Sequence, residues 1–185
     1  MRTKYCFKPL LPCLYVALSL LTSGGAIAAA AKADAATADP AAQYAALSSE
    51  TRQLAERYLQ AYLRKDWATL EPLMAEQIRF LDPTAKLVFG DVDQHGKPAL
   101  LKYFHTVYPY IDTHEFKVGS SFVAGNKAVF IAETDWSFAH PGLPVVRSKA
   151  PIILTLTVED GRVIEHTEMA DLQSFLNQRQ ALKKP

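Results

Sequence analysis

Two titratable side chains, His166 and Glu168, lie close together near the end of the chain, in a segment with the composition of a β-strand. The preceding dipeptide Asp160-Gly161 favours a tight hairpin turn, because glycine readily adopts a positive φ. We therefore predict a strand over residues 162–170, in which His166 and Glu168 share one face. Such a histidine can be a base, a proton shuttle or a donor to an oxyanion, or it can be a buried residue with a structural hydrogen bond.

A carboxylate that can act as a general base, Asp82, follows the apolar residues Ile78, Phe80 and Leu81. Burial in an apolar pocket disfavours the charged form of a carboxylate and raises its pKa toward neutral pH, where a general base works best. The dipeptide Asp82-Pro83 also suits a turn at the end of a strand. Both interpretations, a base in a pocket and a turn residue, stay open on these residues alone.

Two tyrosines, Tyr58 and Tyr62, lie about one turn apart on the apolar stripe of a predicted amphipathic helix. We expect the Tyr58 hydroxyl to point into a pocket as a hydrogen-bond donor, and Tyr62 to pack in its wall. Trp136, on a later strand, is expected at the mouth of this pocket.

The elements that would position these residues follow from hydrophobic periodicity and from turn and cap residues. The expected helices are residues 50–65, capped by Ser48 or Ser49, a second one capped by Thr69 and ending near Ala75, and a third opening at Pro98 and ending at Tyr108. The expected strands are residues 78–81, 86–89, 113–123, 127–138, 145–158 and 162–170, and residues 172–182 can form a last helix. Three helices followed by strands indicate an α+β fold, a curved antiparallel sheet with helices on one side and a pocket on its concave face.

The N-terminal segment, residues 1–28, has the three parts of a secretory signal peptide. It contains a basic region with Arg2, Lys4 and Lys8, an uncharged apolar run over residues 10–21, and the small-residue signal Ala-Ile-Ala at residues 26–28. Cleavage after Ala28 would change the formal charge from +1 to −2. An uncleaved anchor is the alternative, because residues 10–31 carry no charge and are long enough to span a membrane.

The mature chain is expected to comprise an alanine-rich linker at residues 29–47, one domain at residues 48–180 and a short tail at residues 181–185. Both cysteines, Cys6 and Cys13, lie in the signal segment, so the mature chain has no disulfide and no thiol chemistry. We expect a periplasmic or secreted protein with no membrane contact after cleavage.

Composition narrows the range of functions. The 185 residues are 49% hydrophobic and 21% charged, which suits one packed core, and the formal charge of +1 gives no sign of nucleic-acid binding. The five histidines show no metal-binding spacing, and the sequence has neither a glycine-rich phosphate loop nor a nucleophile elbow. We therefore expect no metal and no cofactor.

Three segments within residues 49–178 carry a resemblance to a known family. They are RYLQAYLRKDWATLEPLMAEQIRFLDP (residues 57–83), GKPALLKYF (residues 96–104) and DGRVIEHTEMADLQSFLNQ (residues 160–178). Together they resemble the nuclear transport factor 2-like superfamily, and within it the SnoaL-like polyketide cyclases and the ketosteroid isomerases. The resemblance implies a cone-shaped domain with one deep pocket, lined by the first helix and the concave side of the sheet.

The resemblance also implies roles for particular residues. In the isomerases an aspartate removes a proton beside a carbonyl, while a tyrosine and a protonated aspartate hold the oxyanion. By resemblance, Asp82 takes the base position, Tyr58 the tyrosine position, and Leu154 the place of the second aspartate. The absence of that acid argues against steroid isomerisation, because half of the oxyanion hole is missing. His166 or Glu168 is expected to supply the missing polar group.

We therefore expect a domain that binds a small hydrophobic or aromatic molecule. If it is an enzyme, it carries out cofactor-independent acid–base chemistry such as isomerisation, cyclisation or dehydration. The expected catalytic residues are Asp82, Tyr58 and His166, and the expected binding residues are Tyr62, Phe104, Phe130, Trp136, Leu154 and Glu168. The alternatives are a binding module without turnover and a dimerisation module; a homodimer is expected, with residues 145–158 as the pairing strand.

Overall fold

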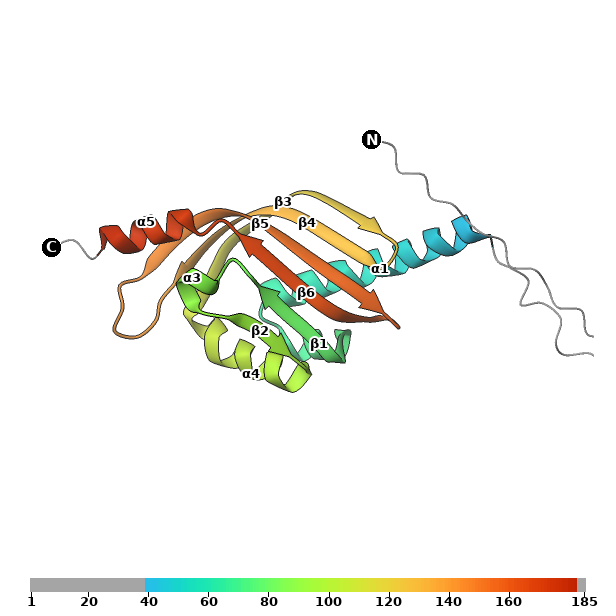
Figure 1. The fold of residues 1–185 in the computed structure, drawn as a ribbon, viewed down its shortest axis with the longest axis horizontal. Coiled ribbons are helices and arrows are strands. Elements are labelled where there is room, and N and C mark those ends of the chain that lie inside the picture. Colours follow the sequence, from blue (N-terminus) through green and yellow to red (C-terminus); the bar gives the residue numbers. More distant parts are fainter. Residues whose placement is uncertain (1–38, 183–185) are drawn as a thin grey trace, which may run out of the picture. The chain divides into compact units, whose positions relative to one another are not determined.

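One six-stranded sheet organises the part of the chain that the structure, a computed structural model, describes, namely residues 39–182 (Figure 1). The expected signal peptide, residues 29–38 of the expected linker and residues 183–185 lie outside this range. The strands are β1 (Met74–Asp82), β2 (Val92–His95), β3 (Ile111–Ala124), β4 (Lys127–Phe138), β5 (Val146–Glu159) and β6 (Arg162–Ala170), in the order β2-β1-β6-β5-β4-β3. Neighbours are antiparallel except β1 and β6, which run parallel. The predicted α+β fold with a mostly antiparallel sheet is confirmed.

The helices lie before, between and after the strands in the chain and pack on the sheet in different places (Figure 1). They are α1 (Pro40–Leu63), α2 (Trp67–Leu70), α3 (Lys86–Phe89), α4 (Lys97–Val107) and α5 (Gln173–Ala181), with short 3₁₀ turns at Glu71–Leu73 and Tyr108–Tyr110. Helix α1 contacts β3, β4, β5 and β6, whereas α4 contacts β1 and β2 and α5 contacts β5. Among residues 39–182, no helix is both long and apolar enough to cross a membrane.

Helix α1 begins at Pro40, and not at Glu50 as the sequence analysis expected. Asp39 caps it by accepting a hydrogen bond from the Ala41 amide, and proline suits the first helical position because its missing N–H has no partner there. Alanine has the highest helix propensity, so residues 40–47 extend the helix although they define no broad apolar face. These residues, expected in the linker, are therefore helical.

The early part of α1 is anchored on the turn between β3 and β4. The Gly125 amide donates a hydrogen bond of 3.1 Å to Ser48 Oγ. Gly125 has φ +58°, and a Cβ there would come within 3.4 Å of the Tyr44 ring. Glycine suits this turn because of its positive φ, which other residues rarely adopt.

Two further predicted elements were wrong in their extent or type. The second helix ends at Leu70 rather than near Ala75, since Asp66 caps it and Pro72 lies in the following 3₁₀ turn, so β1 already starts at Met74. Residues 86–89, expected as a strand, form the one-turn helix α3. Asp82 Oδ1 accepts hydrogen bonds from the Thr84 and Ala85 amides, and this turn just before α3 outweighs the strand propensity of the apolar residues that follow.

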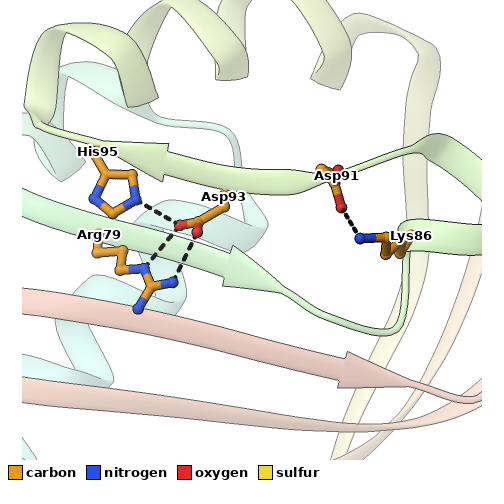
Figure 2. A network of polar contacts seen from close by, with 5 residues as sticks. All are labelled: Arg79, Lys86, Asp91, Asp93 and His95. Carbon is orange, nitrogen blue, oxygen red and sulfur yellow. Dashed lines mark hydrogen bonds and ion pairs between the residues drawn. The ribbon is translucent and has the colours of Figure 1, made fainter.

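The edge strand β2 was missed because its sequence, VDQH, is short and polar. It pairs with β1, and a cluster of side chains joins the two strands (Figure 2). Arg79 donates two hydrogen bonds of 2.8 Å to Asp93, and His95 Nε2 lies 3.0 Å from the same carboxylate. The hydrogen bonds from Arg79 lower the pKa of Asp93 to about 2.

We expect the Asp93→Asn variant to loosen β2 while the remainder of the sheet keeps its protection. The pKa of Asp93 is lower in the folded protein than in the unfolded chain. Its contribution to the stability of the fold is therefore complete at a pH above the ordinary pKa of 3.8 and is lost as the pH falls toward 2. Amide hydrogen exchange at Val92 and Gln94 should therefore become faster in the variant, and β5 should be unaffected. The exposed Asp112→Asn variant is the control, and equal exchange rates in all three proteins would contradict the prediction.

The main core lies between the helices and one face of the sheet. Its fully buried members come from α1, α2, α4 and four strands, and include Tyr58, Phe80, Leu100, Phe104, Leu154, Leu156 and Val163. A second, smaller cluster lies beneath α5, where the Phe175 ring stacks on Trp136 with centroids 5.0 Å apart. An open cavity lies beside these two clusters.

Candidate functional site

A cavity of about 390 Å³ is lined mainly by residues from α1, α4 and all six strands of the sheet. Most of the wall is aromatic or aliphatic, and the titratable groups in it include Asp82, Glu168, Tyr62, Tyr103, Tyr108 and Tyr110. Of the expected site residues, Asp82, Tyr62, Trp136 and Glu168 line this cavity. Its size and apolar wall with few polar groups are those of a site for a small organic molecule.

Asp82 lies at the end of β1, where its half-buried side chain meets the cavity. Oδ1 accepts hydrogen bonds from the Thr84 amide (2.9 Å), the Thr84 hydroxyl (2.6 Å) and the Ala85 amide (3.0 Å). Oδ2 accepts no hydrogen bond from any residue in the described range. Asp82 is therefore both a turn residue and a cavity carboxylate with one oxygen unused.

The balance of burial, hydrogen bonds and charge sets the basicity of Asp82. Burial raises its pKa most, the hydrogen bond from Thr84 lowers it, and the negative charge of Glu168 raises it again. The net result is a pKa above the ordinary value of 3.8. A raised pKa makes the ionised carboxylate a stronger proton acceptor than an exposed aspartate.

Glu168 enters the same cavity from β6, with a side chain that is only 12% exposed. It lies directly opposite Leu154 in the β5–β6 register. Leu154 itself is fully buried and does not line the cavity. The carboxylate absent from the Leu154 position is thus present one strand away, on the neighbouring β6.

Tyrosine hydroxyls form the remaining polar part of the wall. Burial and the charges of Glu168 and Asp82 raise the pKa of Tyr103 to about 12, so its hydroxyl stays protonated. This hydroxyl has no hydrogen-bond partner within residues 39–182 and can donate to a ligand. Tyr62 and Tyr108 hydrogen-bond to one another, and burial raises the pKa of both well above the ordinary range.

His166 lies behind the cavity wall and is fully buried. Its ring makes edge contacts with three aromatic rings, those of Tyr58, Tyr62 and Phe80. Nδ1 is 3.2 Å from the Tyr58 hydroxyl, and Nε2 is 3.3 Å from Glu168 Oε1 without forming a hydrogen bond of good geometry. Tyr58, His166 and Glu168 therefore form a buried series that reaches the cavity only at the glutamate.

Several expected site residues lie in the core rather than in the cavity wall. Tyr58, His166, Phe104, Phe130 and Leu154 are buried and do not line the cavity. Phe104 packs between Trp67 and Tyr108, at ring-centroid distances of 4.7 and 4.8 Å. These residues support the wall from behind.

The sequence analysis missed the tyrosines at the end of α4, Tyr103, Tyr108 and Tyr110. A signal was present, since the segment YFHTVYPY places three hydroxyls around a proline that ends a helix. Among residues 39–182, no three histidine, cysteine or carboxylate side chains lie close enough together to hold a metal ion.

The sequence matches the SnoaL-like domain family over residues 55–166. The chain belongs to the SnoaL-like domain family. This match includes the C-terminal part of α1, the turn at Asp82 and the β5–β6 hairpin up to His166, so all three expected catalytic positions lie within it. No match was found among curated proteins.

Solved structures with low sequence identity share the fold. A protein from Shewanella denitrificans, provisionally assigned as a SnoaL-like polyketide cyclase, is 22% identical over 71% of this chain and 97% of its own, with a TM-score of 0.61. An NTF2-like protein from Burkholderia xenovorans is 15% identical over 71% of this chain and 97% of its own, with a TM-score of 0.58. A Catenulispora acidiphila protein with a ketosteroid isomerase-like fold, solved with trimethylamine, is 15% identical over 69% of this chain and 92% of its own, with a TM-score of 0.55. The predicted SnoaL-like and nuclear transport factor 2-like fold is confirmed.

Proposed function

We propose that this SnoaL-like domain binds a small, largely apolar carbonyl compound and catalyses acid–base chemistry on it without a cofactor. The observation that carries the proposal is the Asp82 carboxylate, which has a raised pKa, one unused oxygen and an apolar surrounding. An isomerase, a cyclase and a dehydratase share the same first step, which is removal of a proton from the carbon beside the carbonyl.

In the proposed step, Asp82 Oδ2 takes this proton and the electron pair moves onto the carbonyl oxygen. The Tyr103 hydroxyl donates a hydrogen bond to the resulting oxyanion, because its raised pKa keeps the proton on the tyrosine. Tyr58 and His166 act indirectly in this proposal. They lie behind Glu168, whose negative charge raises the pKa of Asp82.

The test is deuterium exchange at the carbon beside the carbonyl of a bicyclic aromatic ketone, β-tetralone, followed by NMR in deuterated water. We expect exchange above the background rate with the wild-type protein. The Tyr103→Phe variant should exchange about tenfold more slowly, the amount that one hydrogen bond to a charged group contributes. Ketone binding without exchange would instead support the binding module that the sequence analysis left open.

We also propose that the protein is exported and forms a homodimer. Export is supported by the basic region, apolar run and Ala-Ile-Ala signal of residues 1–28. Dimer formation is supported by Ile131, Ile153 and Met169, which are register neighbours across β4, β5 and β6. Ile131 and Met169 are exposed, and exposed apolar side chains that lie together are typical of protein–protein contacts. The mass of the protein isolated from its own cells shows whether residues 1–28 have been removed. Light scattering of the purified protein shows whether it is a dimer.

A further inference from the structure

A second cavity, of about 290 Å³, adjoins the first one beside α5. Three residues, Phe89, Phe138 and His140, border both cavities. The other residues around the second cavity come from α3, the β4–β5 loop, β5 and α5, and they are Val88, Leu143, Pro144, Val146, Phe175, Arg179 and Leu182. The two cavities therefore share part of their lining.

The two cavities differ in charge. Asp82 and Glu168 give the first a negative inner wall, and its cation Lys65 is bound to the Ile111 carbonyl and paired with Asp112. Arg179 is the only residue with a fixed charge among those lining the second cavity. No ion pair or hydrogen bond joins its guanidinium to another residue in the described range.

This arrangement selects the orientation of a charged ligand. An anionic group beside Asp82 and Glu168 would meet like charge, whereas Arg179 offers a planar, permanently charged donor that fits a carboxylate. The apolar side chains between the two ends suit a hydrocarbon segment. The ligand's charge pattern is therefore opposite to that of the wall.

We propose that the substrate is an elongated molecule with an aromatic or alicyclic carbonyl part in the first cavity and a carboxylate-bearing arm in the second, bound to Arg179. This inference rests on the proposed function for the position of the carbonyl part. It adds the chemical class of the substrate, a keto acid with a long apolar spacer, and it assigns Arg179 as the residue that recognises the acid.

The test compares the affinities of three kinds of ligand for the full mature protein. They are β-tetralone, β-tetralones carrying polymethylene arms of increasing length that end in a carboxylate, and the methyl esters of the same compounds. We expect the carboxylates to bind about tenfold more tightly than their esters at one optimal arm length, as one charge-assisted contact gives. Arg179→Gln should remove this difference and leave the affinity for β-tetralone unchanged, whereas Arg57→Gln, an exposed control on α1, should change neither.

The outcomes separate this inference from the proposed function. If β-tetralone exchanges its protons but the carboxylates bind no better than the esters, the assignment of Arg179 is wrong and the acid–base function stands. If the carboxylates gain affinity through Arg179 but no exchange occurs, the substrate class stands and the catalytic role of Asp82 is wrong. If none of the ketones binds, both are wrong.

Discussion

Replacing Asp82 with asparagine is expected to slow proton exchange of the bound ketone by about a hundredfold to ten-thousandfold, the usual contribution of a positioned general base. Asparagine keeps the shape of the side chain and an oxygen that can accept the bonds from Thr84 and Ala85 at the start of α3. The amide nitrogen that takes the place of Oδ2 cannot accept the proton. NMR exchange measurements and ligand titration on the same sample should therefore show a lost rate with an affinity changed only a few-fold.

The matched control is Asp91→Asn, because Asp91 also borders the cavity but is exposed and pairs with Lys86 at 2.9 Å (Figure 2). This variant should keep the wild-type rate. In the wild-type protein the rate should rise with pH and level off above the raised pKa of Asp82, since only the ionised carboxylate accepts a proton. A fully active Asp82→Asn variant would show that another group, with Glu168 the first to examine, is the base.

The second large effect is expected on the free energy of unfolding, when the buried contact between Tyr58 and His166 is removed. The Tyr58→Phe variant removes the hydrogen-bond partner of His166 Nδ1. The other ring nitrogen of His166, Nε2, already lacks a hydrogen bond. Leaving a buried polar group unsatisfied destabilises a fold by about 1–3 kcal/mol, and we expect a loss of this size in urea unfolding. Tyr110→Phe serves as the control, because the Tyr110 hydroxyl has no hydrogen bond within the described residues.

A double-mutant cycle makes the interpretation specific. His166→Leu should also destabilise the fold, whereas the combination with Tyr58→Phe should cost less than the sum of the two single changes, because neither partner then remains unsatisfied. Strict additivity, or a Tyr58→Phe variant as stable as the Tyr110→Phe control, would contradict the proposed contact. The ketone exchange rate of the same variants shows how far Glu168 depends on this support.

Side-chain alternation predicted the shared face of His166 and Glu168, but it could not give their depth. Both residues point to the inner side of β6, yet His166 is fully buried under three rings while Glu168 reaches the cavity. Depth depends on what neighbouring strands and helices place above each residue. In this fold Phe80, directly opposite His166 on β1, fills the space.

Local patterns were reliable where one signal dominated and failed where two competed. The Asp160-Gly161 turn signal correctly predicted the hairpin of β5 and β6. Residues 86–89 have the composition of a strand but follow the hydrogen-bonded turn at Asp82, and this turn determined the structure. The tyrosines of the cavity were missed because α4 and the 3₁₀ turn that follows it bring Tyr103 and Tyr108 together with residues distant in the sequence.

The hydrogen bonds of Asp82 have a stereochemical consequence. Three donors occupy Oδ1 and fix the carboxylate, so in the proposed step proton transfer to and from a bound ketone would take place through Oδ2 alone. A ligand held by the aromatic wall presents one face of its carbon to that oxygen. Of the two hydrogens on this prochiral carbon, only one would be exchanged, and the reaction product would be a single enantiomer.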